Sequence, residues 1–235
     1  MNIIITGASK GLGYAIAETF ANDKAPHTLF LCARRQEELT EAADTLKSIS
    51  PNITVNTHPC DVSKKEEITA FAEWILEQTS SIDILVNNAG SFLPGSITTE
   101  KEGTLETMLQ TNLHSAYHLT RALLPIMIKA KAGHIFNICS IASLQAYAPG
   151  ASYSISKYAL MGFSKNLRDE MKPHNIKVTT VYPGAFWSES WEGSGINPQR
   201  IMEAADIAKL IHSSAHLSPQ TCLEDIIIRP QLGDL

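Results

Sequence analysis

The chain has 235 residues with a formal net charge of −5, and 44% of its residues are hydrophobic, 18% charged and 7% aromatic. A chain of this kind can bury a substantial core, which excludes a disordered tail, a collagen-like repeat and a disulfide-stapled mini-protein. The negative charge argues against a nucleic-acid partner, whose polyanion requires a cationic surface. The opening MNIIITGASK has no signal-peptide pattern, and no apolar stretch approaches the roughly 20 residues that cross a bilayer. We therefore expect a cytoplasmic protein with no nucleic-acid or membrane partner.

Short β-branched apolar runs alternate along the chain with helical patterns. The runs are Asn2–Thr6, Thr28–Cys32, Ile53–His58, Ile82–Asn87, His134–Cys139, Ile176–Tyr182 and Asp225–Arg229. Between them, apolar residues recur at helical spacing, as at Leu39, Ala42, Ala43 and Leu46. This alternation predicts an α/β fold, a Rossmann-like doubly wound arrangement in which a seven-stranded parallel sheet has helices on both faces. With no linker or repeat in the sequence, residues 1–235 are expected to form a single domain.

The first predicted strand runs directly into a glycine-rich turn and then into a helical pattern. A strand, a glycine-rich turn and a helix in this order form an anion site, because the backbone can approach a pyrophosphate and the helix N-terminus offers free N–H groups. The spacing G-x-x-x-G-x-G differs from the commoner dinucleotide fingerprint, and a flexible turn is the alternative. Its place in a doubly wound pattern favours phosphate binding, at Gly7, Ser9, Lys10, Gly11, Leu12 and Gly13.

The end of the second strand, residues 31–35, reads LCARR and would face the adenosine ribose of a dinucleotide. No acid stands there to accept from a 2′-hydroxyl, whereas Arg34 offers a guanidinium suited to a 2′-phosphate and Lys10 could add a second charge. These residues predict NADP(H) rather than NAD. The alternative is that they are solvated surface charges, which is the interpretation we favour for Arg35.

Residues at the ends of later strands could carry proton chemistry. Ser140 follows the fifth strand, and Tyr153 and Lys157 stand at i and i+4 on one face of a predicted helix. A nearby ammonium favours the phenolate, so Lys157 can poise Tyr153 as a proton donor or acceptor near neutral pH. Ser140 could hydrogen-bond a substrate oxygen and stabilise charge developing on it. Taken alone, a Tyr-x-x-x-Lys pair is common on helix surfaces.

Together these motifs resemble the classical short-chain dehydrogenase/reductase family, from residue 2 to nearly the end of the chain. The resemblance rests on the glycine-rich turn, the NNAG run at 87–90, Asn112, Ser140, Tyr153, Lys157 and Pro183-Gly184. It implies an NADP-binding oxidoreductase domain that transfers hydride between the nicotinamide of NADP(H) and a small carbonyl or alcohol substrate. It also implies a homodimer or homotetramer built on the helices that carry Asn112 and Tyr153.

The resemblance implies a role for each matching residue. Tyr153 would be the catalytic acid/base, Lys157 would lower its pKa and bind the nicotinamide ribose, and Ser140 would orient the substrate oxygen. Asn112 would kink its helix and hold a water that relays protons to Lys157. Ser188 stands where the family usually has Thr, and keeps the hydroxyl without the methyl. Beyond the glycine-rich turn, the implied cofactor contacts are Arg34, Asp61, Val62, Asn88, Ala89, Gly90, Tyr153, Lys157, Pro183, Gly184 and Ser188.

The substrate and one alternative function remain open at this stage. The ending EDIIIRPQLGD resembles bacterial sepiapterin-reductase-like members more than 3-oxoacyl-(acyl-carrier-protein) reductases, which tend to finish in Gly-Gly-Met. A 3-oxoacyl or general ketone reductase is the second enzyme hypothesis. A non-catalytic NADP(H) sensor is the hypothesis from another class, although a sensor would not need the four residues Asn112, Ser140, Tyr153 and Lys157 together.

An irregular stretch between Pro183 and Gln199 could contribute to the substrate side. Its aromatic residues Phe186, Trp187 and Trp191 could cover an apolar substrate, or they could pack a surface loop on the core. Asp234 could anchor a substrate amine, although an acid near the end of a chain is most often solvated.

Two histidine pairs, His114 with His118 and His212 with His216, have the i, i+4 spacing that can bind a metal ion. Neither pair includes the Glu of an H-E-x-x-H motif, and the sequence offers no obvious third ligand. We therefore expect surface or subunit-interface histidines and no metal site.

Overall fold

The computed structural model describes residues 1–188, 191, 193 and 195–234. These residues form a seven-stranded all-parallel sheet of order β3-β2-β1-β4-β5-β6-β7, which confirms the predicted fold class. The strands are β1 (Asn2–Thr6), β2 (His27–Ala33), β3 (Ile53–Pro59), β4 (Ile84–Asn87), β5 (His134–Ile138), β6 (Lys177–Pro183) and β7 (Asp225–Ile228). Their bounds differ from the predicted ones by one or two residues, the usual uncertainty at element ends.

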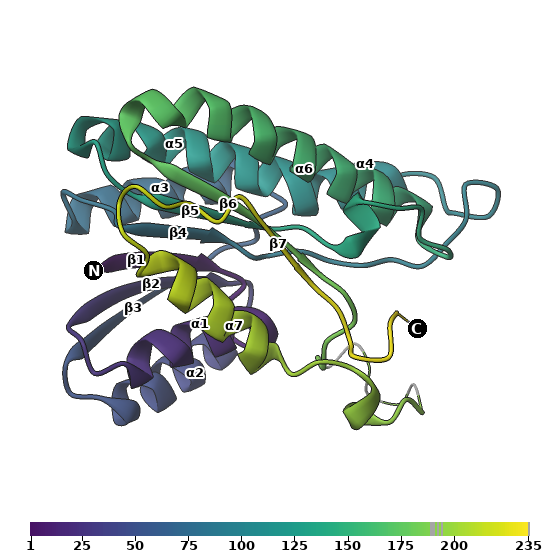
Figure 1. Cartoon of the computed structure of the whole chain (residues 1–235), viewed down its shortest axis with the longest axis horizontal. Helices are drawn as coiled ribbons and strands as arrows, with labels where there is room; N and C mark the ends of the chain where they lie inside the picture. Colours follow the sequence, from purple (N-terminus) through teal and green to yellow (C-terminus); the bar gives the residue numbers. More distant parts are fainter. Residues whose placement is uncertain (189–190, 192, 194, 235) are drawn as a thin grey trace.

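Helices cover both faces of this sheet (Figure 1). One face carries α1 (Gly11–Asn22), α2 (Gln36–Ile49) and α7 (Ala204–Ala215), and the other carries α3 (Lys65–Gln78), α5 (Ser115–Ala130) and α6 (Ala151–Met171). The short helix α4 (Thr104–Leu109) leads into α5 through a π-helical turn, Gln110–His114. No helix among the described residues is long and apolar enough to span a bilayer.

The strand β1 shows why the sheet is covered on both sides. Successive side chains of a strand point to opposite faces, so Ile3 and Ile5 join the core beneath α1, α2 and α7, while Ile4 joins the core beneath α3 and α5. All three are fully buried. An uninterrupted apolar run is therefore what a central parallel strand requires.

All seven parallel strands end at one edge of the sheet, on the right in Figure 1, and the turns that follow them lie there. The glycine-rich turn after β1, Asn88 after β4, Ser140 after β5 and Gly184 after β6 meet at this edge. The opposite edge, where β1 and β2 begin, lies beside the end of α7.

The two histidine pairs lie in different surroundings. His114 hydrogen-bonds with the side chain of Gln110 on its own helix, at 3.1 Å. His212, at the end of α7, instead contacts Asp23, which follows α1, at 2.9 Å. The fold therefore brings a carboxylate beside His212 that the sequence did not reveal, because Asp23 is distant in the chain and reaches the pair where α1 packs against α7.

Candidate active site

The glycine-rich turn has the conformation that only glycine adopts readily. Gly7 and Gly11 have φ of +66° and +58°. Gly13 is required for a different reason, because a Cβ atom there would lie 2.3 Å from the carbonyl oxygen of Gly7. The helix α1 begins at Gly11, and its N-cap residue Lys10 makes no side-chain capping hydrogen bond. The first N–H groups of α1 thus have no side-chain cap and suit an anion.

The end of β4 is tied to this turn through Asn88 and Thr6. The Asn88 side-chain amide donates to the carbonyl oxygens of Thr6 at 2.8 Å and Gly7 at 3.1 Å. The Thr6 hydroxyl in turn accepts from the N–H groups of Asn88 at 3.0 Å and Ala89 at 2.9 Å. These bonds hold the two turns together across the switch point of the sheet, where ligands of open α/β sheets bind.

Arg34 and Arg35 follow β2 and differ in their partners. Arg35 forms an ion pair with Glu38, as expected of a surface charge. The exposed Arg34 acts on Asp61, which follows β3. Partial burial works to raise the pKa of the Asp61 carboxyl, but hydrogen bonds from Ser63, the charge of Lys64 and, least of these, the charge of Arg34 together lower that pKa. A cationic and an anionic side chain thus stand at the edge where the adenosine half of a dinucleotide would lie.

A cavity of about 350 Å³ lies at the same edge, between the glycine-rich turn and the start of α6. Eight of the predicted site residues line it: Leu12, Asn88, Gly90, Ser140, Tyr153, Lys157, Gly184 and Ser188. The other predicted residues do not line this cavity: Gly7, Ser9, Lys10, Gly11, Gly13, Arg34, Asp61, Val62, Ala89, Asn112 and Pro183. They lie in or next to the turns at the carboxyl edge, except Asn112, which lies in the π-helical turn.

Tyr153 lies in the first turns of α6, half-buried, with its ring 5.1 Å from that of Phe92 and 6.5 Å from that of Tyr147. Burial raises the pKa of the Tyr153 phenol to about 12, and a hydrogen bond with Ser140 opposes that rise. The net direction differs from the lowering expected from Lys157, whose ammonium lies 5.9 Å from the ring centroid, because burial of the phenol is the largest influence on its pKa.

The Lys157 side chain is 5% exposed, and its Nζ donates to the carbonyl oxygen of Ile138 at 2.8 Å. Burial lowers its pKa. Gly90 lies beside this ammonium, because a Cβ atom at Gly90 would lie 3.1 Å from Asn112 Oδ1 and 3.4 Å from Nζ. The ammonium has three N–H donors, so it can also donate to hydroxyl groups of a molecule in the cavity.

Asn112 lies in the π-helical turn and is 1% exposed. Its Oδ1 accepts from the N–H of Ser91 at 2.8 Å, and its Nδ2 donates to the carbonyl of Ser91 at 3.0 Å and to Ser156 Oγ at 2.9 Å. The irregularity expected at this residue is therefore a π-helical turn. The side chain joins the segment after β4 to α6; its predicted role in holding a water stays a prediction.

The substrate side of the cavity is aromatic. Phe186 and Trp191 line it, but Trp187 does not and instead lies beside residues 198–206. Phe92 and Tyr147 also line it. They were not predicted from the sequence, where only the aromatic residues after Pro183 were singled out. Both follow the carboxyl ends of strands, β4 and β5, which is the signal that could have found them.

Asp234 reaches the cavity from the far end of the chain. Its Oδ2 accepts from Arg229 at 2.8 Å, whereas its Oδ1 is buried and has no hydrogen-bond partner among the described residues. A buried oxygen of this kind requires a donor. The cavity therefore combines aromatic walls, a phenol with a serine, a buried ammonium and one carboxylate oxygen.

The chain was compared with known proteins. The family model described as short chain dehydrogenase matches residues 1–196. A sepiapterin reductase of Chlorobaculum tepidum is 31% identical over 239 aligned residues, which cover 99% of this chain and 97% of that protein.

Solved structures resemble the chain over nearly its whole length. A metagenomic short-chain oxidoreductase in complex with NADP is 32% identical with a TM-score of 0.84, covering 98% of this chain and 97% of that one. L-sorbose reductase from Gluconobacter frateurii, complexed with NADPH and L-sorbose, is 26% identical with a TM-score of 0.88, covering 97% of this chain and 94% of that one.

Proposed function

The chain belongs to the short-chain dehydrogenase/reductase family, and from this premise we propose that it uses NADP(H) to interconvert a small carbonyl compound and its alcohol. The family accounts for an oxidoreductase acting on carbonyl or alcohol groups. The proposal adds the choice of cofactor, the residues in their roles and the class of substrate. It treats residues 1–235 as one NADP-binding oxidoreductase domain.

The observation that carries the proposal is the shared cavity. Ser140, Tyr153 and Lys157 line the same space as Leu12 and Gly90, which lie beside the predicted dinucleotide turns. A dinucleotide bound along the carboxyl ends of the strands would thus bring one of its ends close to Ser140, Tyr153 and Lys157. The left-handed glycines, the crowded Gly13 and the uncapped start of α1 all fit a dinucleotide.

Three residues of the cavity have separate roles in the proposed proton transfer. The Tyr153 phenol, protonated at neutral pH, donates its proton to the oxygen of a carbonyl substrate and takes it back from an alcohol. Ser140 holds that oxygen by a hydrogen bond, and Lys157 binds ribose hydroxyls and provides positive charge when the phenol gives up its proton. The nicotinamide, when bound, supplies or accepts the hydride.

The preference for NADP(H) rests on Arg34. It is the exposed cation directly after β2, and no acid occupies its position. A guanidinium pairs with a phosphate through parallel charge-assisted hydrogen bonds. The structures of the metagenomic oxidoreductase and of L-sorbose reductase contain NADP and NADPH, which supports the same choice.

The substrate class follows from the walls of the cavity. The rings of Phe92, Tyr147, Phe186 and Trp191 suit a flat, partly apolar molecule. The unpartnered Oδ1 of Asp234 suits a hydroxyl or amine donor on that molecule. A sepiapterin-like ketone meets both requirements, and the 31% identical relative is a sepiapterin reductase.

A panel of carbonyl and alcohol substrates, followed through nicotinamide absorbance, tests the proposal. It includes pterin ketones, simple ketones and 3-oxoacyl thioesters, each with NADPH and with NADH. We expect turnover with NADPH and the highest kcat/KM for a flat ketone that carries a hydrogen-bond donor. Preference for 3-oxoacyl thioesters would favour the second enzyme hypothesis. NADPH binding without turnover of any compound would favour a sensor and contradict the proposal.

The assembly we propose is a homodimer or homotetramer built on α5 and α6. Exposed aromatic and aliphatic side chains lie on this surface, with Tyr117, Ile155 and Tyr158 between 37% and 44% exposed. Large apolar side chains gathered on one helical surface are typical of a subunit interface.

A further inference from the structure

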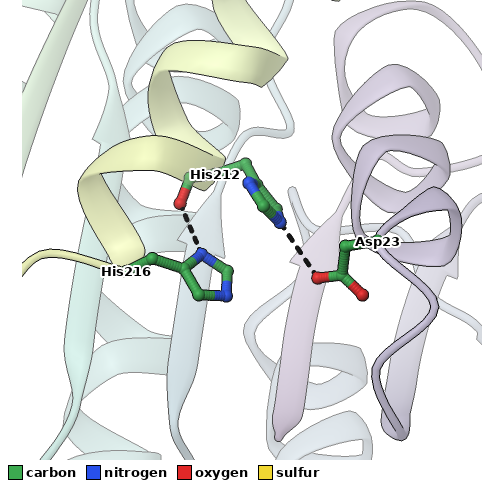
Figure 2. A group of neighbouring side chains, drawn as sticks. All are labelled: Asp23, His212 and His216. Atoms are coloured by element: carbon green, nitrogen blue, oxygen red, sulfur yellow. Dashed lines mark hydrogen bonds and ion pairs between the residues drawn. The ribbon is translucent and has the colours of Figure 1, made fainter.

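Asp23, His212 and His216 form a cluster at the edge of the sheet opposite the cavity. Asp23 is the C-cap residue of α1, His212 lies in the last turn of α7, and His216 is the C-cap residue of α7. Figure 2 shows the three side chains between the ends of these two helices. One ligand atom from each lies within 4.8 Å of those of the other two, and this is the one such His, Cys, Asp and Glu group among the described residues.

The donor atoms of the cluster are already oriented. His212 Nε2 lies 2.9 Å from Asp23 Oδ2, within hydrogen-bond distance. His216 Nδ1–H donates to the carbonyl oxygen of His212 at 2.8 Å, which leaves the lone pair of His216 Nε2 available. A metal-binding histidine commonly donates its other ring N–H to a backbone carbonyl in this way, because the bond fixes the tautomer and the ring orientation.

The carboxylate is held in place by groups outside the cluster. His27, whose side chain is 2% exposed, places Nε2 2.8 Å from Asp23 Oδ2 and 3.0 Å from Oδ1. The N–H of Ala25 donates to Oδ1 at 2.8 Å. Partial burial works to raise the pKa of the Asp23 carboxyl, but the hydrogen bonds with His212 and His27 outweigh it and the pKa is lowered. The contacts with His27 and Ala25 therefore restrain the carboxylate.

We propose that Asp23, His212 and His216 bind Zn²⁺ and that the ion clamps α7 to α1. Two imidazole nitrogens and a carboxylate oxygen form a donor set that Zn²⁺ accepts, with water in the fourth position. The ion takes the place of the hydrogen bond between His212 Nε2 and Asp23 Oδ2, and the neutral His212 ring then carries its proton on Nδ1. His27 stays outside the coordination sphere and holds the carboxylate.

The distances permit this geometry with little movement. Zn–N and Zn–O bonds of about 2.0 to 2.2 Å place neighbouring ligand atoms roughly 3.3 Å apart in a tetrahedron. The contact between His212 and Asp23, now 2.9 Å, opens slightly. The exposed His216 closes the remaining gap by a small shift that can keep its bond to the His212 carbonyl, because the ligand atoms already lie within 4.8 Å of one another. The fold thus supplies two ligands in place and a third that is free to adjust.

The second histidine pair of the chain provides a matched control. His114 and His118 have the same spacing, with ring centroids 6.1 Å apart. They do not belong to the one metal-ligand group found among the described residues. The i, i+4 spacing alone therefore does not distinguish the two pairs, whereas the carboxylate does.

The role expected of the ion is structural. Both helices pack around Phe20, whose ring lies 4.9 Å from that of His212 and 6.2 Å from that of His216. The cluster lies where β2 begins, whereas the cavity lies where the strands end (Figure 1). An ion that binds only the folded state raises its stability in proportion to the logarithm of ion concentration over Kd. The proposal is independent of the oxidoreductase function.

The test is a Zn²⁺ titration of the full chain after chelator treatment, read by competition with a chromophoric chelator and by melting temperature. We expect one Zn²⁺ per chain and a melting temperature that rises with Zn²⁺. His216→Ala and Asp23→Asn should each weaken Zn²⁺ binding by about tenfold or more and abolish the rise. His114→Ala should behave as the unchanged chain does.

His216→Ala decides the outcome, because His216 is exposed and its replacement leaves the contacts of Asp23 with His27 and His212 intact. Its melting temperature without Zn²⁺ shows that the variant folds. If the unchanged chain does not bind Zn²⁺, or if His216→Ala binds it as tightly as His114→Ala does, the assignment is overturned.

Discussion

The Tyr153 phenol is protonated in neutral solution, because burial raises its pKa to about 12 and the hydrogen bond with Ser140 only opposes that rise; this suits the proposed role of proton donor. A phenol below its pKa can give a proton and above it can accept one. Reduced nicotinamide carries no positive charge that would lower this pKa. The two directions of the reaction should therefore depend on pH differently.

We expect carbonyl reduction to be flat from about pH 6 to about pH 9 and alcohol oxidation to rise with pH over the same range. In Ser140→Ala the rising limb of oxidation should move to higher pH, because the hydrogen bond that lowers the phenol pKa is lost. Profiles of kcat/KM against pH in both directions measure this. A reduction rate that falls with a midpoint near neutrality would contradict the raised pKa of the Tyr153 phenol.

Arg34 and Arg35 offer a comparison between adjacent cations. Arg34→Asp should raise the Kd for NADPH by about 10- to 100-fold and leave that for NADH nearly unchanged, because a charge-assisted phosphate contact contributes about 1.5 to 3 kcal/mol. Arg35→Asp is the control, since Arg35 pairs with Glu38. Fluorescence titration of both coenzymes measures the effect. Equal losses for NADPH and NADH in Arg34→Asp would show that this residue does not bind the 2′-phosphate.

At the scale of the element, the π-helical turn Gln110–His114 places Asn112 between two segments of the site. Its side-chain amide accepts from the N–H of Ser91 and donates to the carbonyl of Ser91 and to the hydroxyl of Ser156 on α6. Because Asn112 is 1% exposed, water does not readily replace these bonds. The turn therefore supports the wall of the cavity that carries Phe92.

Asn112→Ala should lower the free energy of unfolding by about 2 kcal/mol, because polar groups of Ser91 and Ser156 lose their partner. Asn166→Ala is the matched control, since Asn166 is exposed on α6 and donates only to the carbonyl of Gly162. Urea unfolding midpoints measure both. Equal midpoints for the two variants would contradict the supporting role of Asn112.

The elements themselves were predictable because their signals are local. The apolar runs give the strands, and a turn with glycines at 7, 11 and 13 needs no distant partner to be recognised. Contacts between distant segments were not predictable. His212 meets Asp23 only through the packing of α7 on α1. Trp187 does not line the cavity although Phe186, its neighbour, does, because side-chain direction in an irregular segment has no period.

At the scale of the whole molecule, α5 and α6 form the surface that the proposed assembly buries. We expect light scattering to give a mass that is two or four times the 25.7 kDa of one chain. Tyr117→Glu should shift it toward one chain, because a charge would be buried in an apolar interface. Leu210→Glu, on α7 and 39% exposed against 37% for Tyr117, should not. A mass of 25.7 kDa for the unchanged protein would contradict the proposed assembly.

Local sequence patterns could not specify the substrate, because the cavity that would bind it is assembled from distant segments. The cavity draws Phe92, Tyr147, Phe186 and Asp234 from four separate segments, and its shape exists only in the folded chain. The proposed catalytic residues could be picked out because Tyr153 and Lys157 share a helix face and Ser140 follows a strand. Their convergence with Gly90 on one cavity is what the structure adds.

The most direct test of the central claim compares Tyr153→Phe with the unchanged protein in NADPH-dependent reduction of the best carbonyl substrate. Phenylalanine keeps the ring contact with Phe92 but has no proton to give. We expect kcat/KM to fall by about two to four orders of magnitude while the Kd for NADPH stays nearly unchanged. An undiminished rate in Tyr153→Phe, with NADPH bound normally, would contradict the assignment of Tyr153 as the catalytic acid.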